Sequence, residues 1–78
     1  METVAEKLAR ASAAARVGEG DQARRLYEEA LAEAPGNVEA WLGLAGVVSS
    51  AEDKRTCFMQ ALRLDPANAE ALAGIDLL

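Results

Sequence analysis

The chain has 78 residues, a formal net charge of −5 and an apolar fraction of 51%, which is enough for one small domain with a limited core. Its eight basic residues are scattered, so we expect neither a nucleic-acid partner nor a membrane-surface helix. No stretch of about 20 apolar residues predicts a membrane span, and the acidic N-terminus and lone cysteine predict a cytoplasmic protein without a signal peptide or disulfides.

Helical patterns run along the whole chain, and no segment has the alternation that is typical of a strand. Apolar residues recur at helical spacing, and turn residues separate the runs. Because the connections are short, neighbouring helices are expected to be antiparallel. The patterns predict five helices, over residues of about 3–17, 22–34, 38–50, 51–64 and 69–77.

The turns between these helices contain residues that can cap a helix N-terminus. Gly20 or Asp21 is expected to cap the second helix, and Asn37 the third. Ser49, with Glu52 three residues later, has the pattern of a capping box for the fourth helix.

One phrase occurs twice: YEEALAEAPGN over residues 27–37 and FMQALRLDPAN over residues 58–68. Both copies contain an aromatic residue, Ala-Leu and Pro-x-Asn at the same positions, so the chain has a repeat period of 58 − 27 = 31. A unit this short cannot bury its own apolar face, so repeated units stack on one another. The sequence therefore predicts an all-α stack of helix hairpins.

These residues resemble the tetratricopeptide repeat, whose pattern places Trp, Leu, a small residue and Tyr on a first helix and Ala, Phe, Ala and Pro on a second. The second unit is also similar to the short-period units that occur in tandem in bacterial proteins. The resemblance implies one domain, 1–78, with repeats at about 3–34 and 38–64 and a capping half unit at 69–78. The matching residues are Trp41, Leu44, Ala45, Val48, Phe58, Ala61 and Pro66 in the second unit and Gly18, Ala23, Tyr27, Ala30 and Pro35 in the first.

The chain departs from the family pattern in two places. Its repeat period is three short of the family value of about 34, and the deficit falls around 49–53, which predicts a tighter hairpin there. In strict register the first helix has Lys7 and Arg10 where Trp and Leu belong. The alternative is a small rotation or a one-residue shift that puts Leu8 in their place.

The apolar stripes predict which side chains form the core. All three aromatic residues belong to it, and the lone thiol is expected to be a small buried group beside them. In the last two helices, four leucine or isoleucine side chains are expected to face inward. These predicted core residues are Tyr27, Trp41, Phe58, Cys57, Leu62, Leu64, Leu72 and Ile75.

No group of residues predicts catalysis or a cofactor. The chain has no histidine and one cysteine, which excludes the ordinary zinc sites, and it has no phosphate-binding glycine loop. Glu28, Glu29 and Glu33 lie along one helix and are expected to form a solvated face. We therefore expect no catalytic residue, no metal and no cofactor, and we do not expect an enzyme.

The resemblance implies that the first helix of each unit lines a surface for a partner peptide or helix. Glycine costs about 1 kcal/mol in a helix relative to alanine, so either close helix packing or a ligand is expected to lie against Gly43 and Gly46. Some members of the family bind a C-terminal carboxylate with cations and amides, but the corresponding places here hold Leu8, Ser12 and Gly43, and Arg16 alone cannot form such a site. The candidate partner-binding positions are Leu8, Ser12 and Arg16 on the first helix and Leu42, Gly46 and Ser49 on the third.

These features predict a protein–protein interaction module, with affinity from a few apolar anchors rather than from charge. One alternative is a structural domain that self-associates, since the chain ends in Ile-Asp-Leu-Leu. The other is a stable fragment of a larger multidomain bacterial protein.

Overall fold

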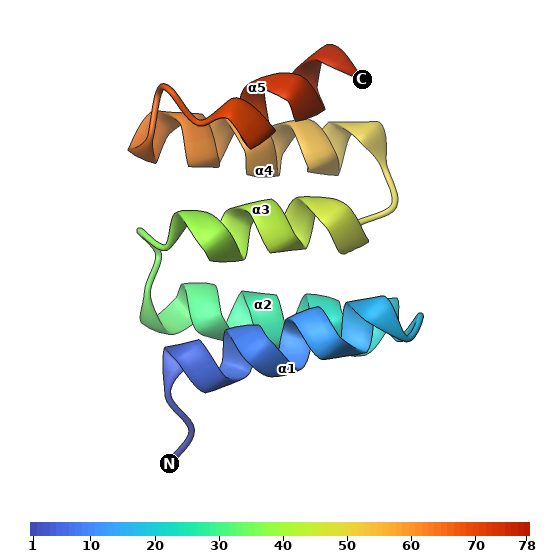
Figure 1. Cartoon of the computed structure of the whole chain (residues 1–78), viewed down its shortest axis with the longest axis vertical. Helices are drawn as coiled ribbons and strands as arrows, with labels where there is room; N and C mark the ends of the chain where they lie inside the picture. Colours follow the sequence, from blue (N-terminus) through green and yellow to red (C-terminus); the bar gives the residue numbers. More distant parts are fainter.

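The computed structural model describes all 78 residues and contains five α-helices and no strand, as the sequence predicts. Consecutive helices run in alternating directions and stack along the long axis, with the two termini at opposite ends of the molecule (Figure 1). None of the helices is both long and apolar enough to cross a membrane. They are α1 (Val4–Arg16), α2 (Gly20–Glu33), α3 (Val38–Val47), α4 (Ala51–Leu64) and α5 (Ala69–Asp76).

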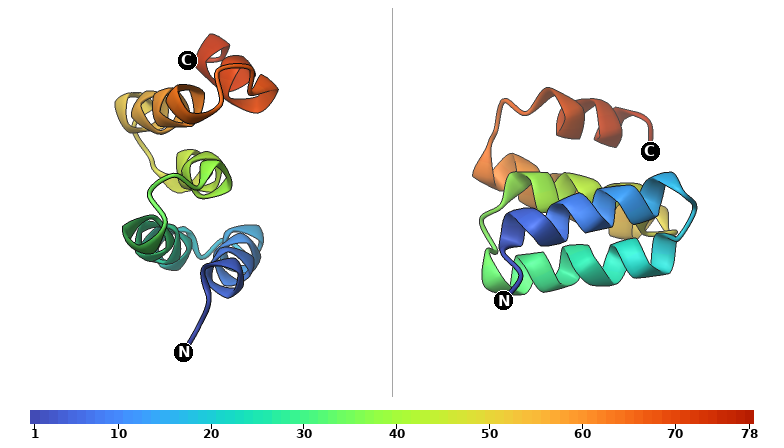
Figure 2. Two further views of the ribbon diagram at one scale, coloured as in Figure 1. Left: turned by 90° about the vertical axis from the view of Figure 1, so that its left-hand side faces the viewer. Right: turned by 60° about the horizontal axis from the view of Figure 1, so that its bottom comes forward.

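The helices form two layers. Figure 2 shows α1, α3 and α5 on one side of the molecule, which we call the helix-A layer, and α2 and α4 on the other, the helix-B layer. Each helix packs against its neighbours in the chain, and α1 also packs against α3. The central helix α3 therefore touches α1, α2 and α4.

The second unit is three residues shorter because helix α3 is shorter, so the prediction of a tighter hairpin is wrong. The helices of the A layer begin at residues 4, 38 and 69, so the first spacing is 38 − 4 = 34 and the second is 69 − 38 = 31. α1 has 13 residues and α3 has 10, while both connections inside the hairpins, 17–19 and 48–50, have the same length. The second unit has therefore lost about one helical turn and kept its loop.

A lysine side chain caps the C-terminal end of the shortened α3. Lys54 lies one repeat period after Ala23, which is fully buried in the first hairpin. Its ammonium group donates to the carbonyl oxygen of Ala45 at 3.0 Å. A cation that bonds the last carbonyls of a helix satisfies an unpaired acceptor and interacts favourably with the helix dipole. The second unit therefore replaces a small buried residue with a side chain that caps the shortened helix.

α2 begins without a side-chain cap, and the prediction of Gly20 or Asp21 as its cap is wrong. Both residues lie inside the helix, and Glu19 precedes it without a side-chain hydrogen bond to the first turn. The end of α1 explains the early start: Gly18 has a φ of 83°, and the N–H of Glu19 donates to the carbonyl oxygen of Ala14 at 2.9 Å. This left-handed closure reverses the chain so tightly that α2 follows at once.

The next two helices have side-chain caps. Asn37 caps α3 as predicted, because its side-chain oxygen accepts from the N–H of Ala40 at 2.9 Å. α4 is capped by Ser50, which accepts from the N–H of Asp53 at 3.0 Å. The prediction of Ser49 as the cap is wrong because the chain leaves α3 earlier than expected and is extended where it enters α4.

The core runs through the first four helices. Tyr27 and Cys57 are buried in it as predicted, whereas Trp41 and Phe58 are half-buried and pack against it. The indole N–H of Trp41 donates to the carbonyl oxygen of Pro35 at 3.0 Å, which satisfies its one polar atom. The core cluster consists of Leu8, Ala11, Ala14, Ala23, Leu26, Tyr27, Ala30, Leu31, Ala40, Leu44, Ala45 and Cys57.

Two of the predicted core leucines are exposed. Leu64 is 39% exposed and Leu72 is 48% exposed, while Ile75 is half-buried. Leu64 stands one repeat period after the exposed Glu33, so it occupies an outward position of the second helix of its unit. Leu72 is exposed because α5 packs mainly on α4 and no further helix covers it.

Glycine allows two close helix crossings. A Cβ atom at Gly43 would overlap ring atoms of Tyr27 and lie 2.6 Å from its hydroxyl oxygen, and a Cβ at Gly74 would overlap the ring of Phe58. The two pairs are related by one repeat period. Close packing therefore explains Gly43, whereas a Cβ at Gly46 would meet nothing within 4 Å.

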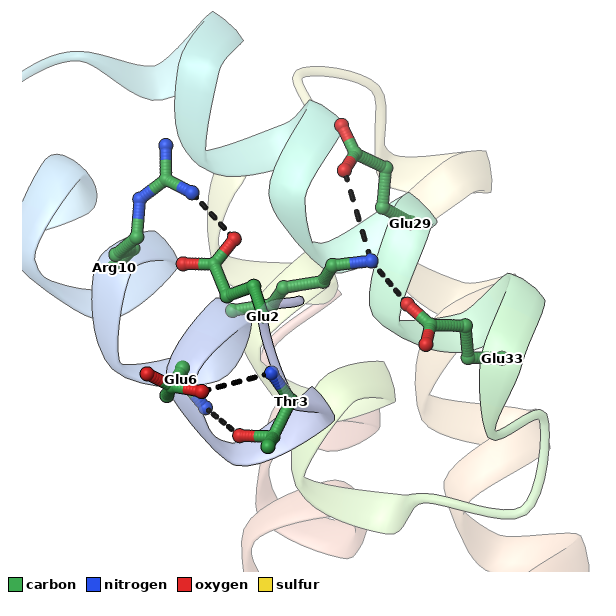
Figure 3. A network of polar contacts seen from close by, with 7 residues as sticks. Glu2, Thr3, Glu6, Arg10, Glu29 and Glu33 are labelled. Atoms are coloured by element: carbon green, nitrogen blue, oxygen red, sulfur yellow. Dashed lines mark hydrogen bonds and ion pairs between the residues drawn. The ribbon is translucent and has the colours of Figure 1, made fainter.

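Polar contacts fix the register of α1 (Figure 3). Lys7 corresponds to Trp41 in strict register, and its side chain is only 17% exposed. Its ammonium group forms ion pairs with Glu33 and with Glu29, the latter at 3.9 Å, and both glutamates remain exposed, as predicted for this face. The contact with Glu33 raises the pKa of Lys7. The starts of α1 and α3 keep the 34-residue spacing of strict register, but Arg10 is 54% exposed where Leu44 is 7% exposed, and Leu8 is the buried leucine of α1.

Candidate protein-interaction surfaces

The helix-A layer carries a shallow hollow of about 530 Å³, which we call the helix-A hollow. One wall is α1 and the other is the beginning of α3. Most of the lining side chains are short, and a single glutamate supplies the charge. The lining residues are Val4, Ala5, Leu8, Ala9, Ser12, Asn37 and Glu39.

The helix-A hollow contains two of the six predicted binding residues. Leu8 and Ser12 both line it, with Leu8 8% exposed as part of the core and Ser12 exposed. Arg16 is exposed in the last turn of α1 and lies outside the hollow. On α1, therefore, Leu8 and Ser12 line the same hollow and Arg16 lies outside it.

The predicted positions on the second unit divide between two sides of the molecule. Leu42 is half-buried and Gly46 is exposed on α3, and neither lines the helix-A hollow. Ser49 lies in the connection after α3 and lines a different cavity. Helical periodicity placed Ser49 with Gly46 because α3 was expected to continue to residue 50, and the structure ends α3 at Val47.

That second cavity is a cleft of about 540 Å³ between the two helices of the B layer, which we call the helix-B cleft. Apolar side chains of α3 and α4 line it, and charged side chains of α2 and α4 surround them. Sequence reasoning missed this cleft, although the short repeat period signalled that the second hairpin differs from the first. The lining residues are Asp21, Arg24, Glu28, Trp41, Leu44, Val47, Val48, Ser49, Asp53, Thr56 and Cys57.

Both cavities have an acidic character. Asp21, Glu28 and Asp53 line the helix-B cleft with one cation, Arg24, which is paired to Glu28 at 3.2 Å. Glu39 is the charged residue of the helix-A hollow. An acidic surface favours apolar or cationic ligand groups over anionic ones.

The lone thiol in the helix-B cleft has the properties of a core residue. Cys57 is 4% exposed, and burial is the main cause that raises the pKa of its thiol, with the charge of Asp53 adding to it. A thiol with a raised pKa stays protonated at neutral pH and is a poor nucleophile. No group of three histidine, cysteine, aspartate or glutamate side chains is arranged to hold a metal ion.

The family model of the tetratricopeptide repeat matches residues 4–47. The match covers 47 − 4 + 1 = 44 of the 78 residues, which is more than half of the chain. The chain belongs to the tetratricopeptide repeat family. A comparison with curated proteins finds no match.

The matched segment spans three helices of the tetratricopeptide repeat stack. It begins at the first residue of α1 and ends at the last residue of α3. The match stops where the second unit lacks three residues relative to the family period of about 34. Tetratricopeptide repeats are in general scaffolds for protein interactions, because stacked hairpins present extended surfaces.

Proposed function

We propose that this chain is a non-enzymatic protein-interaction scaffold that binds a peptide or helix of a partner protein through the helix-A layer. The observation that carries the proposal is the open surface over α1 and α3. Ala5, Ala9 and Ser12 are exposed on α1, and Gly46 is exposed on α3 with nothing near the place of a Cβ atom. Short side chains on adjacent helices let a partner backbone approach closely.

The binding would rest on shape and on a few apolar contacts. Leu8 provides the apolar floor of the helix-A hollow, and Leu42 is a half-buried apolar side chain on the neighbouring helix of the same layer. A small number of well-packed apolar anchors supplies most of the energy of such interfaces. Of the six predicted positions, Leu8 and Ser12 line the hollow itself, and Leu42, Gly46, Arg16 and Ser49 lie outside it.

The test fills the surface without disturbing the core. Peptides selected against the chain from a random displayed library are measured by fluorescence anisotropy with the variants Ser12→Arg and Gly46→Arg. Both positions are exposed, so both variants are expected to fold and to weaken binding by about tenfold or more, equivalent to about 1.4 kcal/mol. Ala13→Arg is the matched control, because Ala13 is exposed on the same helix outside the hollow.

A peptide whose affinity is unchanged by Ser12→Arg and Gly46→Arg but is lowered by Thr56→Arg would bind in the helix-B cleft. That result would contradict the proposal. Thr56 is exposed and lines that cleft. Thermal unfolding of each variant, followed by circular dichroism, shows whether lost binding reflects lost structure.

Self-association is the second candidate function, and exposed leucines favour it. Leu72, Leu77 and Leu78 are 48%, 87% and 40% exposed at the C-terminal end of the stack. Exposed apolar patches mark contact surfaces more often than scattered single residues do. Analytical ultracentrifugation over a wide concentration range tests it, and a monomer throughout would argue against it.

A further inference from the structure

The helix-B cleft is a groove in the middle of the stack, with a helix on either side and a helix as its floor. α2 and α4 both pack against α3, but they do not pack against each other in the way that α1 packs against α3. Figure 2 shows α3 set back between the two helices of the B layer. The side of α3 that faces outward between α2 and α4 is therefore the floor of the cleft.

The floor is apolar and is not fully covered by the fold. Trp41, Val47 and Val48 line the cleft and are half-buried, and Leu44 between them is buried. The indole N–H of Trp41 is already bonded to the carbonyl oxygen of Pro35, so the part of this side chain that a ligand meets is apolar. Burial of apolar surface by a ligand would supply the binding energy.

The charges around this floor are unevenly neutralised. Figure 1 shows the first turns of α2 and α4 on the same side of the stack, and Asp21 and Asp53 belong to these two turns. Both line the cleft, and no ion pair of the structure includes either carboxylate. Further along α2, Glu28 is paired with Arg24. The cleft therefore has one end where two carboxylates have no cation.

Cys57, between the walls, reports that both walls make the cleft negative. Burial is the largest cause that raises the pKa of its thiol. The charge of Asp53 on α4 and that of Glu28 on α2 raise it further, against the opposing charge of Lys54. Negative potential in a partly apolar groove favours a ligand that carries a cation beside apolar groups.

We propose that the helix-B cleft binds a segment of a partner protein in which an arginine or lysine lies next to large apolar side chains. The apolar side chains cover Trp41, Val47 and Val48, and the cation lies at the end of the cleft where Asp21 and Asp53 have no partner. The cleft is on the opposite layer from the helix-A hollow, so the inference does not rest on the proposed function.

The test compares charged and neutral peptides of the same shape. An array of hexapeptides places one arginine among leucine, valine, phenylalanine and alanine, and a second array has citrulline in place of arginine. Trp41 is the only tryptophan of the chain and lines the cleft, so its fluorescence reports binding there. The best arginine peptides are expected to bind saturably and about tenfold more tightly than their citrulline partners. Added salt should reduce this difference.

Variants of the full chain locate the cation. Replacing both free carboxylates, by Asp21→Asn with Asp53→Asn, is expected to weaken the arginine peptides about tenfold and to leave the citrulline peptides unchanged. Glu52→Gln is the matched control, because Glu52 is an exposed acid of the same first turn of α4 and does not line the cleft. This control removes the same charge from the same helix end, so it accounts for effects on the helix dipole. Thr56→Arg is expected to block both peptide sets.

The proposal is overturned if no arginine peptide binds at about 1 mM, or if the arginine and citrulline peptides bind equally. An effect of the double aspartate variant no larger than that of Glu52→Gln would also overturn it, as would binding that is lost with Ser12→Arg instead of Thr56→Arg. These outcomes leave the proposed function of the helix-A layer in place. Conversely, an unbiased selection that returns only cleft-binding peptides would contradict that function and would leave this inference standing.

Discussion

Two glycines on α3 give opposite predictions for the same substitution. Gly43→Ala is expected to lower stability or leave it unchanged, whereas Gly46→Ala is expected to raise it. Both changes remove the backbone freedom of glycine, which is worth about 1 kcal/mol in a helix. Only Gly43 faces a neighbour, because its Cβ would overlap the ring of Tyr27, and a Cβ at Gly46 would meet nothing within 4 Å.

The size of the difference follows from the packing of the tyrosine. Tyr27 is 7% exposed and belongs to the core cluster, so its ring has little room to move away from a Cβ at position 43. Extra carbon atoms in a packed core cost about 1–3 kcal/mol. The variants should therefore differ by about 1–3 kcal/mol, with Gly46→Ala about 1 kcal/mol above the parent chain.

Thermal and urea unfolding followed by circular dichroism measure this difference. In a domain of this size about 1 kcal/mol shifts the thermal midpoint by about 4–8 °C, so the two variants should separate clearly. The matched control is the background Tyr27→Leu, in which the ring is absent and Gly43→Ala should become stabilising. Equal stabilisation by Gly43→Ala and Gly46→Ala in the parent chain would refute the assignment of Gly43 to a close helix crossing.

Three further predictions concern the second unit. Lys54→Met should lower the free energy of unfolding by about 1–2 kcal/mol in urea titrations, because the carbonyl oxygen of Ala45 loses its charged donor. The control Arg55→Met, at the exposed neighbouring residue, should change this free energy by less than about 0.5 kcal/mol. Asn37→Ala should cost about 1 kcal/mol through the lost cap of α3, measured in the same way. Cys57 should react with a disulfide reagent only on unfolding. Because burial raises its pKa above the ordinary value of 9.0, its contribution to stability is present below pH 9.0 and is lost as pH rises through the folded pKa, a decline that Cys57→Ala should reduce.

The repeat in the sequence was sufficient to predict the five helices and their stacking. The phrases that end in Pro-x-Asn fix two helix ends, and Asn37 then caps the next helix as expected. The period alone could not say which element had lost three residues, because a shorter loop and a shorter helix give the same count. Lys54 was the available signal, because it stands at the place of the buried Ala23 and its ammonium group bonds a carbonyl oxygen near the end of α3.

The candidate site was predicted less well than the fold. The helical period correctly placed Leu8 and Ser12 on one surface, since both lie within a regular helix. Ser49 was assigned to the same surface as Gly46, but the chain is extended after Val47, and the direction of a side chain there no longer follows the helical period. The surface predicted for a residue near a helix end is therefore correct only if the end of the helix is predicted correctly.

The first and the last helix of the helix-A layer hold different residues at the same two repeat positions. At the N-terminal end the places of Trp41 and Leu44 are held by Lys7 and Arg10, which are satisfied by ion pairs with glutamates. At the C-terminal end the same places hold leucine and isoleucine, and the leucine is 48% exposed. The same two positions of the repeat are thus polar on α1 and apolar on α5. On α1, Lys7 meets the glutamates of α2, whereas Leu72 on α5 meets no such helix, so the two positions do not have equivalent surroundings.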